Sequence, residues 1–82
     1  MSVYNDEFEV LGFNNELKNP LKGRIYYQKR AIYIRDVVGL DIQKGYKLIK
    51  HHHSGYQDEF LVIDVTKKRS LTGVLVIYIM RI

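Results

Sequence analysis

Hydrophobic residues recur along this chain in short runs, and polar segments rich in glycine, asparagine and serine separate them. Short runs with many β-branched and aromatic residues are typical of β-strands. Almost nothing in the chain has the spacing of a long amphipathic helix. The pattern therefore predicts five strand regions, at residues 8–13, 24–38, 46–52, 60–65 and 74–82.

The strand predicted at the end of the sequence is the most apolar one. Residues 74–80 are all apolar, so large side chains point to both faces of the sheet. This suits a central strand, or one held between a core and a partner, because an open apolar edge promotes aggregation. We expect this strand, which begins with Val74 and includes Ile82, to be covered, and self-association through it is one way to cover it.

The second predicted strand region is longer than a typical strand. We expect it to bend or break near Gln28, Lys29 and Arg30. The connection before it, residues 14–23, has room for one helical turn that begins at an asparagine cap and ends before Pro20.

The third and fourth predicted strands are separated by residues 53–57, whose turn chemistry indicates an antiparallel hairpin. In the fourth strand, alternation places Leu61, Ile63 and Val65 on one apolar face. The other face includes Asp64, so we expect the Leu61 face to point into the core.

Together these segments predict an all-β domain, or a β domain with one short helical turn, built as a five- to six-stranded barrel or sandwich. The 82 residues fit one small domain, which we divide into an acidic arm with the first strand (1–17) and a basic body (18–82). The chain has no cysteine, so disulfides and thiolate metal sites are excluded. A small domain without them favours a tight barrel or an oligomeric interface.

Charge is unevenly distributed along the sequence. Residues 1–17 contain four acids and no Lys or Arg, whereas residues 18–82 contain all 13 Lys and Arg and the other five acids, which gives −4 and +8. An excess of this kind favours nucleic acid, an anionic membrane surface or an acidic protein as partner. A solvated surface with no ligand is the alternative interpretation.

Two groups of residues are candidates for binding a polyanion. Basic and aromatic residues alternate in the second strand region, and this combination binds single-stranded nucleic acid through phosphate neutralisation and base stacking. A basic loop before the last strand is the second candidate. The alternative for the strand is that its tyrosines are half-buried packing residues. The alternative for the loop is that its cations only prevent aggregation of the neighbouring strands. The predicted binding residues are Lys29, Arg30, Tyr33, Arg35, Lys67, Lys68 and Arg69.

Three consecutive histidines suggest a metal site, because imidazole is a common metal ligand. On a strand only His51 and His53 share a face, with Asp58 or Glu59 as a third ligand across the hairpin. A solvated turn is the favoured interpretation. Since the sequence has no phosphate loop, nucleophile elbow or paired-histidine helix, we expect neither an enzyme nor a cofactor.

Residues 21–82 resemble a shortened ASCH domain, a PUA-like barrel associated with RNA-related functions. The resemblance rests on Gly23 followed seven residues later by Arg30, on residues 44–45 opening a strand, and on the two last strands. Family members commonly have a lysine and a glutamate where this chain has Ile25 and Gln28. The resemblance therefore implies the fold and a nucleic-acid surface, but no amidohydrolase activity.

The sequence thus predicts a non-enzymatic basic binding module that engages nucleic acid. The alternatives are a structural subunit of a homo-oligomer or virion, and an inhibitor or adaptor that binds an acidic protein. The first seven residues lack the basic and apolar segments of a secretory signal, and no apolar run reaches the roughly 18 residues of a membrane span. We therefore expect a cytoplasmic or intravirion protein that is not secreted and has no membrane partner.

Overall fold

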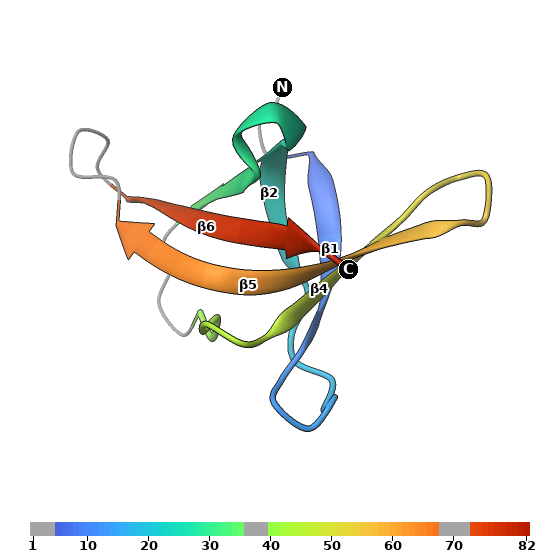
Figure 1. The fold of residues 1–82 in the computed structure, drawn as a ribbon, viewed down its shortest axis with the longest axis horizontal. Helices are drawn as coiled ribbons and strands as arrows, with labels where there is room; N and C mark the ends of the chain where they lie inside the picture. The colour runs from blue at the N-terminus through green and yellow to red at the C-terminus, as the bar shows by residue number, and fades with distance from the viewer. Residues whose placement is uncertain (1–4, 36–39, 68–72) are drawn as a thin grey trace.

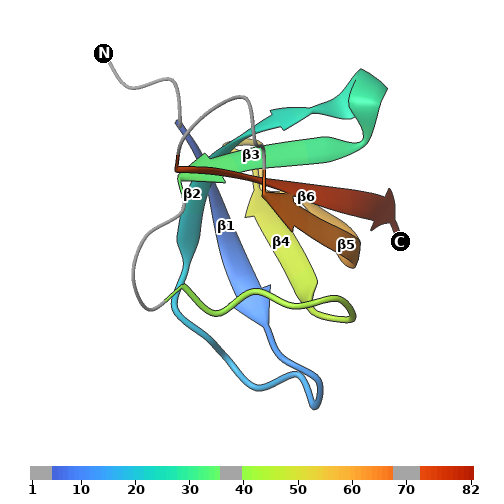
Figure 2. The ribbon, with the colours of Figure 1, turned by 90° about the vertical axis from the view of Figure 1, so that its left-hand side faces the viewer.

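Six antiparallel strands close into a barrel in the order β1-β2-β3-β6-β5-β4 (Figures 1 and 2). The computed structural model describes residues 5–35, 40–67 and 73–82. The predicted small all-β barrel is confirmed. Its elements are β1 (Asp6–Leu11), β2 (Leu21–Tyr26), the 3-10 turn η1 (Tyr27–Lys29), β3 (Ala31–Arg35), β4 (Lys47–His51), β5 (Gln57–Lys67) and β6 (Val74–Arg81).

The barrel consists of two meanders of three strands, β1-β2-β3 and β4-β5-β6. The two meanders join through the pairs β3·β6 and β1·β4. The strand order is therefore symmetric: swapping β1, β2 and β3 with β4, β5 and β6 gives the same arrangement. The apolar strand β6 pairs with β3 on one edge and with β5 on the other. This confirms the expected central strand. Because both edges are occupied, contact with a second copy would use side chains of β6 and not its backbone.

Side chains from all six strands fill the barrel. Phe8, Ile32, Leu48 and Ile77 are fully buried, and Phe60 and Val62 are nearly so. Alternation along the strands explains the pattern, since every second residue points inward. Burial of each such side chain contributes about 1.5–3 kcal/mol. The barrel is therefore held by its interior, which leaves the outer faces of the strands to carry function.

The predicted inward face of β5 is wrong for Leu61 and Ile63, whereas Val65, beyond the bulge, is partly buried and packs against the core. Phe60 and Val62 are buried, whereas Ile63 is 43% exposed. A register shift between Val62 and Asp64 explains the difference. A bulge places two successive residues outside, so Asp64 leaves the face of Phe60 and Val62 and lies in water.

The break expected near residues 28–30 is confirmed, because η1 separates β2 from β3. Arg30 ends that turn with φ 51° and ψ 46°, a left-handed conformation that interrupts the alternation of the sheet. The helical turn expected in residues 14–20 is wrong. Strand β1 ends at Leu11, and the N–H of Gly12 donates to the Glu16 carbonyl at 2.8 Å within a non-helical loop.

The expected hairpin between the third and fourth predicted strands is confirmed, since β4 and β5 pair from Lys47↔Leu61 to His51↔Gln57. At its turn the N–H of Gly55 donates to the His52 carbonyl at 3.0 Å. Within the described residues, no helix is long and apolar enough to cross a membrane.

Candidate nucleic-acid interface

The outer face of the β2–β3 hairpin carries a cluster of cationic and aromatic side chains. Arg24 lies opposite Tyr33 in the register, and alternation puts Tyr26 on the same face as Arg24. The rings of Tyr26 and Tyr33 meet edge to face, with centroids 5.0 Å apart and an interplanar angle of 60°. We refer to Arg24, Tyr26, Lys29 and Tyr33 as the hairpin cluster.

Both cations of the hairpin cluster lie over its rings. The Lys29 ammonium is 5.4 Å from the Tyr26 centroid and 6.0 Å from the Tyr33 centroid. The Arg24 guanidinium carbon is 5.4 Å from the Tyr26 centroid. Contacts of this kind contribute about 0.5–1 kcal/mol at exposed sites. They bring positive charge and flat rings into one small area.

The β2–β3 hairpin is rich in cations and contains no acid of its own. Residues 21–35 contain five cations and no carboxylate. No carboxylate among the described residues forms an ion pair with Lys22, Arg24, Lys29 or Arg30, whereas Lys18, Lys50 and Arg81 each have an acidic partner. Four cations of the hairpin thus have no ion-paired acid within the described part of the chain, unlike Lys18, Lys50 and Arg81.

The structure brings together some of the predicted binding residues. Lys29 and Tyr33 belong to the hairpin cluster, and Arg35 follows Tyr33 by two residues on the same outer face of β3. Arg30 ends η1 with a left-handed backbone, its carbonyl accepts a hydrogen bond from the Ile79 N–H, and it lines a groove beside β6 together with Lys29.

Lys67, the first residue of the predicted basic loop, lies at the same end of the sheet as Arg35. Lys67 is the last residue of β5 and pairs with Leu75, which is also the partner of Ile34. The backbone of Lys67 is therefore two strands from the end of β3, about 10 Å away. Lys68 and Arg69 lie outside the described residues.

A groove of about 730 Å³ runs beside the hairpin cluster, over β5 and β6. Exposed Tyr27, Ile63, Tyr78 and Met80 line it. The sequence pattern did not predict this groove, because the position of Ile63 on the outer face depends on the bulge in β5. Its remaining lining residues are Lys29, Arg30, Phe60, Ile79 and Arg81.

One end of the barrel holds Asp58, the only polar side chain buried among the described residues. Its carboxylate lies 2.7 Å from His52 Nε2 and also contacts the guanidinium of Arg81. These partners, the His52 hydrogen bond foremost, lower the pKa of Asp58 below its ordinary value of 3.8. The ring of His52 stacks on Tyr56 with centroids 4.3 Å apart. A fully partnered carboxylate of this kind stabilises the fold.

The three consecutive histidines diverge. His51 Nε2 lies 3.1 Å from a Glu9 carboxylate oxygen, whereas His52 turns to Asp58. Asp58 was a candidate third ligand for a metal held by His51 and His53. In the structure its carboxylate is bound instead by His52, the histidine between them. Within the described ranges, no three His, Asp or Glu side chains are grouped to hold a metal ion.

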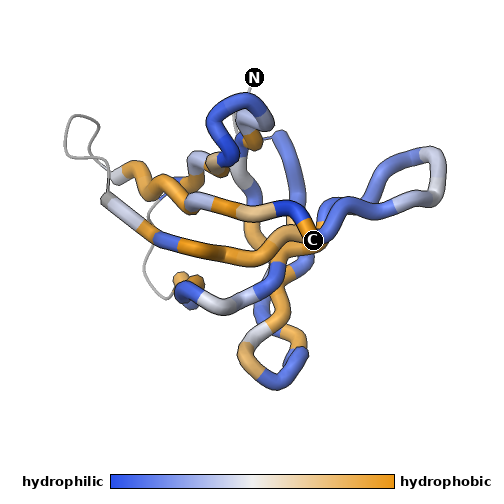
Figure 3. The backbone as a smooth tube through the Cα atoms, viewed as in Figure 1, coloured by the Kyte–Doolittle hydropathy of each residue, from blue (hydrophilic) through white to orange (hydrophobic). Residues whose placement is uncertain are grey.

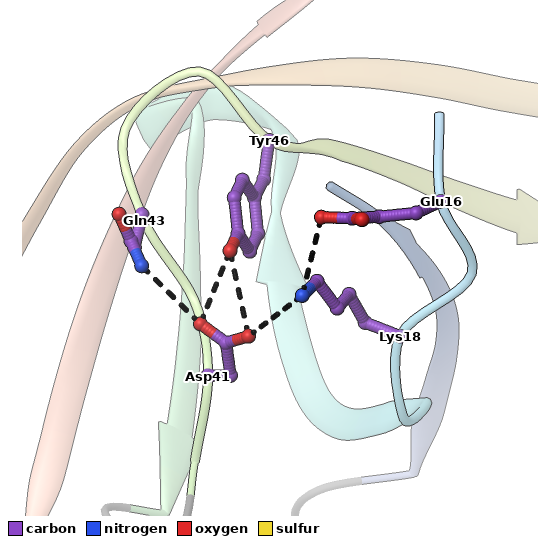
Figure 4. A network of polar contacts seen from close by, with 5 residues as sticks. All are labelled: Glu16, Lys18, Asp41, Gln43 and Tyr46. Carbon is purple, nitrogen blue, oxygen red and sulfur yellow. Dashed lines mark hydrogen bonds and ion pairs between the residues drawn. The ribbon is translucent and has the colours of Figure 1, made fainter. Parts of the chain in front are cut away.

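A second polar network joins the β1–β2 loop to the segment before β4 (Figure 4). The Lys18 ammonium lies 3.2 Å from Glu16 and 3.3 Å from Asp41, and the Tyr46 hydroxyl donates to Asp41 at 3.2 Å. Burial opposes ionisation of Asp41, but the bonds from Lys18, Gln43 and Tyr46 prevail and lower its pKa. The network fixes two loops together, and its cation is fully paired.

Comparison of the chain with protein families, curated proteins and solved structures finds no match. The resemblance to ASCH domains therefore stays a prediction. The geometry of the hairpin cluster and of the groove is the basis for inferring function.

Proposed function

We propose that this protein is a non-enzymatic module that binds single-stranded nucleic acid through the outer face of the β2–β3 hairpin. The observation that carries the proposal is the position of the Lys29 ammonium over both Tyr26 and Tyr33, in a hairpin without carboxylates. Cations beside half-buried flat rings match the alternation of phosphate and base along a single strand.

Each part of the hairpin cluster has a distinct task in this proposal. Lys29 and Arg24 neutralise phosphates, which releases counterions and supplies most of the affinity. Tyr26 and Tyr33 stack against bases, which adds about 1–3 kcal/mol per stacked base whatever the sequence. Arg35 extends the track at the far end of β3, and the backbone of Lys67 lies at the same end of the sheet.

Fluorescence anisotropy with labelled oligo(dT) and oligo(U) of about 12 nucleotides tests the proposal. We expect binding that weakens steeply with salt, with a slope of about −0.7 for each neutralised phosphate. Lys29→Gln and Arg24→Gln each reduce the magnitude of that slope. Lys44→Gln removes an exposed cation outside the hairpin and serves as the matched control. Absence of binding at low salt, or equal effects of all three variants, would refute the proposal.

An acidic protein surface is the alternative partner for the same cations. Substitution of the tyrosines distinguishes the two kinds of partner. A base stacks on a tyrosine ring, whereas a carboxylate needs only the positive charge. We expect Tyr26→Leu to weaken binding to oligo(U) while binding to polyglutamate is unchanged. If both ligands weaken equally, or polyglutamate alone binds, the partner is an acidic protein and the chain is an adaptor or inhibitor.

A further inference from the structure

Exposed apolar side chains gather at two separate places on this barrel. Among the described residues, eight large apolar or aromatic side chains are exposed. Four of them, Tyr27, Ile63, Tyr78 and Met80, line the groove over β5 and β6. Two more, Phe13 and Leu17, lie in the β1–β2 loop. Contiguous apolar patches with charged rims mark interaction surfaces.

The β1–β2 loop projects from the barrel as a knob (Figures 1 and 3). Leu17 is 70% exposed and Phe13 is 62% exposed. The knob is held in place: the Phe13 ring packs edge to face on Tyr46 at 4.9 Å, and Lys18 joins the loop to Asp41 at 3.3 Å. Its apolar side chains are thus presented to solvent on a fixed support, which lowers the entropy lost on association.

The knob and the groove cannot meet within one molecule. The knob precedes β2, and η1, which lines the groove, follows it, so the six residues of β2 separate them by about 20 Å. In addition, β1 and β6 are three strands apart in either direction around the barrel. A knob therefore reaches only the groove of another copy.

The two surfaces are complementary in charge as well as in polarity. Lys29, Arg30 and Arg81 lie around the apolar groove, which has no carboxylate among its lining residues. The knob carries Glu16, whose side chain is 53% exposed although its carboxylate also lies 3.2 Å from Lys18 of the same loop. An acidic group beside two apolar side chains fits an apolar floor with a cationic rim.

We propose that copies of this chain associate head to tail, with Leu17 and Phe13 of one copy seated in the groove of the next and Glu16 facing Arg30. One repeated contact would then cover six of the eight exposed side chains. Such a contact is heterologous, so it generates a ring if the rotation closes and a filament if it does not. It requires no nucleic acid, although Lys29 belongs to both surfaces.

Sedimentation velocity of the full chain without nucleic acid tests this contact. We expect the average mass to rise with protein concentration above the 9.7 kDa of one copy. Leu17→Lys in the knob and Met80→Lys in the groove each lower the association constant by about tenfold or more, since each places a cation in an apolar contact. Tyr56→Lys, at a side chain 57% exposed outside both surfaces, leaves association unchanged.

Mixing the two variants identifies the head-to-tail geometry. The Leu17→Lys chain keeps its groove and the Met80→Lys chain keeps its knob, so an equimolar mixture forms a dimer with one copy of each and does not extend further. Circular dichroism of each variant confirms that it is folded. The proposal is overturned if the wild-type chain stays monomeric at high concentration, if Leu17→Lys associates normally, or if the mixture forms no dimer.

Discussion

The buried carboxylate of Asp58 accepts a hydrogen bond from Nε2 of His52 at 2.7 Å. His52 directly follows β4, and Asp58 is the second residue of β5. The guanidinium of Arg81, the last residue of β6, donates to the other carboxylate oxygen. One carboxylate therefore links three strands at this end of the barrel.

We predict that Asp58→Asn destabilises the fold by about 1–3 kcal/mol, because the amide cannot accept both bonds and leaves a buried polar group unsatisfied. Urea unfolding followed by circular dichroism measures the change. Asp64→Asn provides the matched control on the same strand, since Asp64 is exposed and the change there should stay within about 0.5 kcal/mol. Equal losses in the two variants would contradict a special role for Asp58.

Because of the Asp58 carboxylate, we expect the stability of the fold to depend on pH. The pKa of Asp58 is lower in the folded chain than its ordinary value of 3.8, with the His52 hydrogen bond as the main cause. The stability contributed by this group is therefore fully present above pH 3.8 and is lost as pH falls through the folded pKa. Urea midpoints below pH 5 should fall more steeply for the wild-type chain than for Asp58→Asn. Parallel curves would show that other carboxylates cause the acid sensitivity.

At Gly23, the addition of a single methyl group is expected to lower the stability of the fold. A Cβ at this residue would lie 2.6 Å from Ile34 Cγ2 and 2.8 Å from the Tyr33 carbonyl oxygen. Since backbone cannot move away without disturbing the β2–β3 pairing, we expect Gly23→Ala to destabilise the barrel by about 1–3 kcal/mol.

Gly12→Ala is the comparison for Gly23→Ala, since the three atoms nearest to its Cβ would all belong to the side chains of Glu16 and Lys18. Flexible side chains can shift, so this variant should lose less stability than Gly23→Ala in the same thermal unfolding experiment. A larger loss for Gly12→Ala would show that the close approach of β2 to β3 is not the limiting contact.

Much of this barrel could be predicted from local patterns. The apolar run that starts at Val74 predicted a central strand, and the excess length of region 24–38 predicted a break. The inward face of β5 was not predictable in this way, because strict alternation assigns Ile63 to the core and a bulge reverses that assignment. A bulge depends on pairing with β6, which is a long-range contact.

The candidate site was predictable only in part, for the same reason. Lys29 and Tyr33 share a surface with Arg24 and Tyr26 because β2 and β3 pair in one register. Alternation along one strand cannot supply that register. Arg30 differs from its neighbours because its backbone is left-handed. This conformation is unusual for an arginine, so the sequence pattern does not predict it. The groove unites η1, β5 and β6, which only the closed barrel brings together.

Arg30 yields a last prediction, since its φ of 51° costs about 1–2 kcal/mol for a residue with a Cβ. Arg30→Gly removes this cost and should stabilise the chain by up to about 1 kcal/mol, once the greater freedom of glycine in the unfolded state is deducted. Arg30→Ala removes the same charge but keeps the Cβ, so it should not stabilise. Thermal unfolding of both variants separates backbone strain from charge. A stabilised glycine variant that also loses head-to-tail association would show that strain is retained at Arg30 because its cation serves the groove.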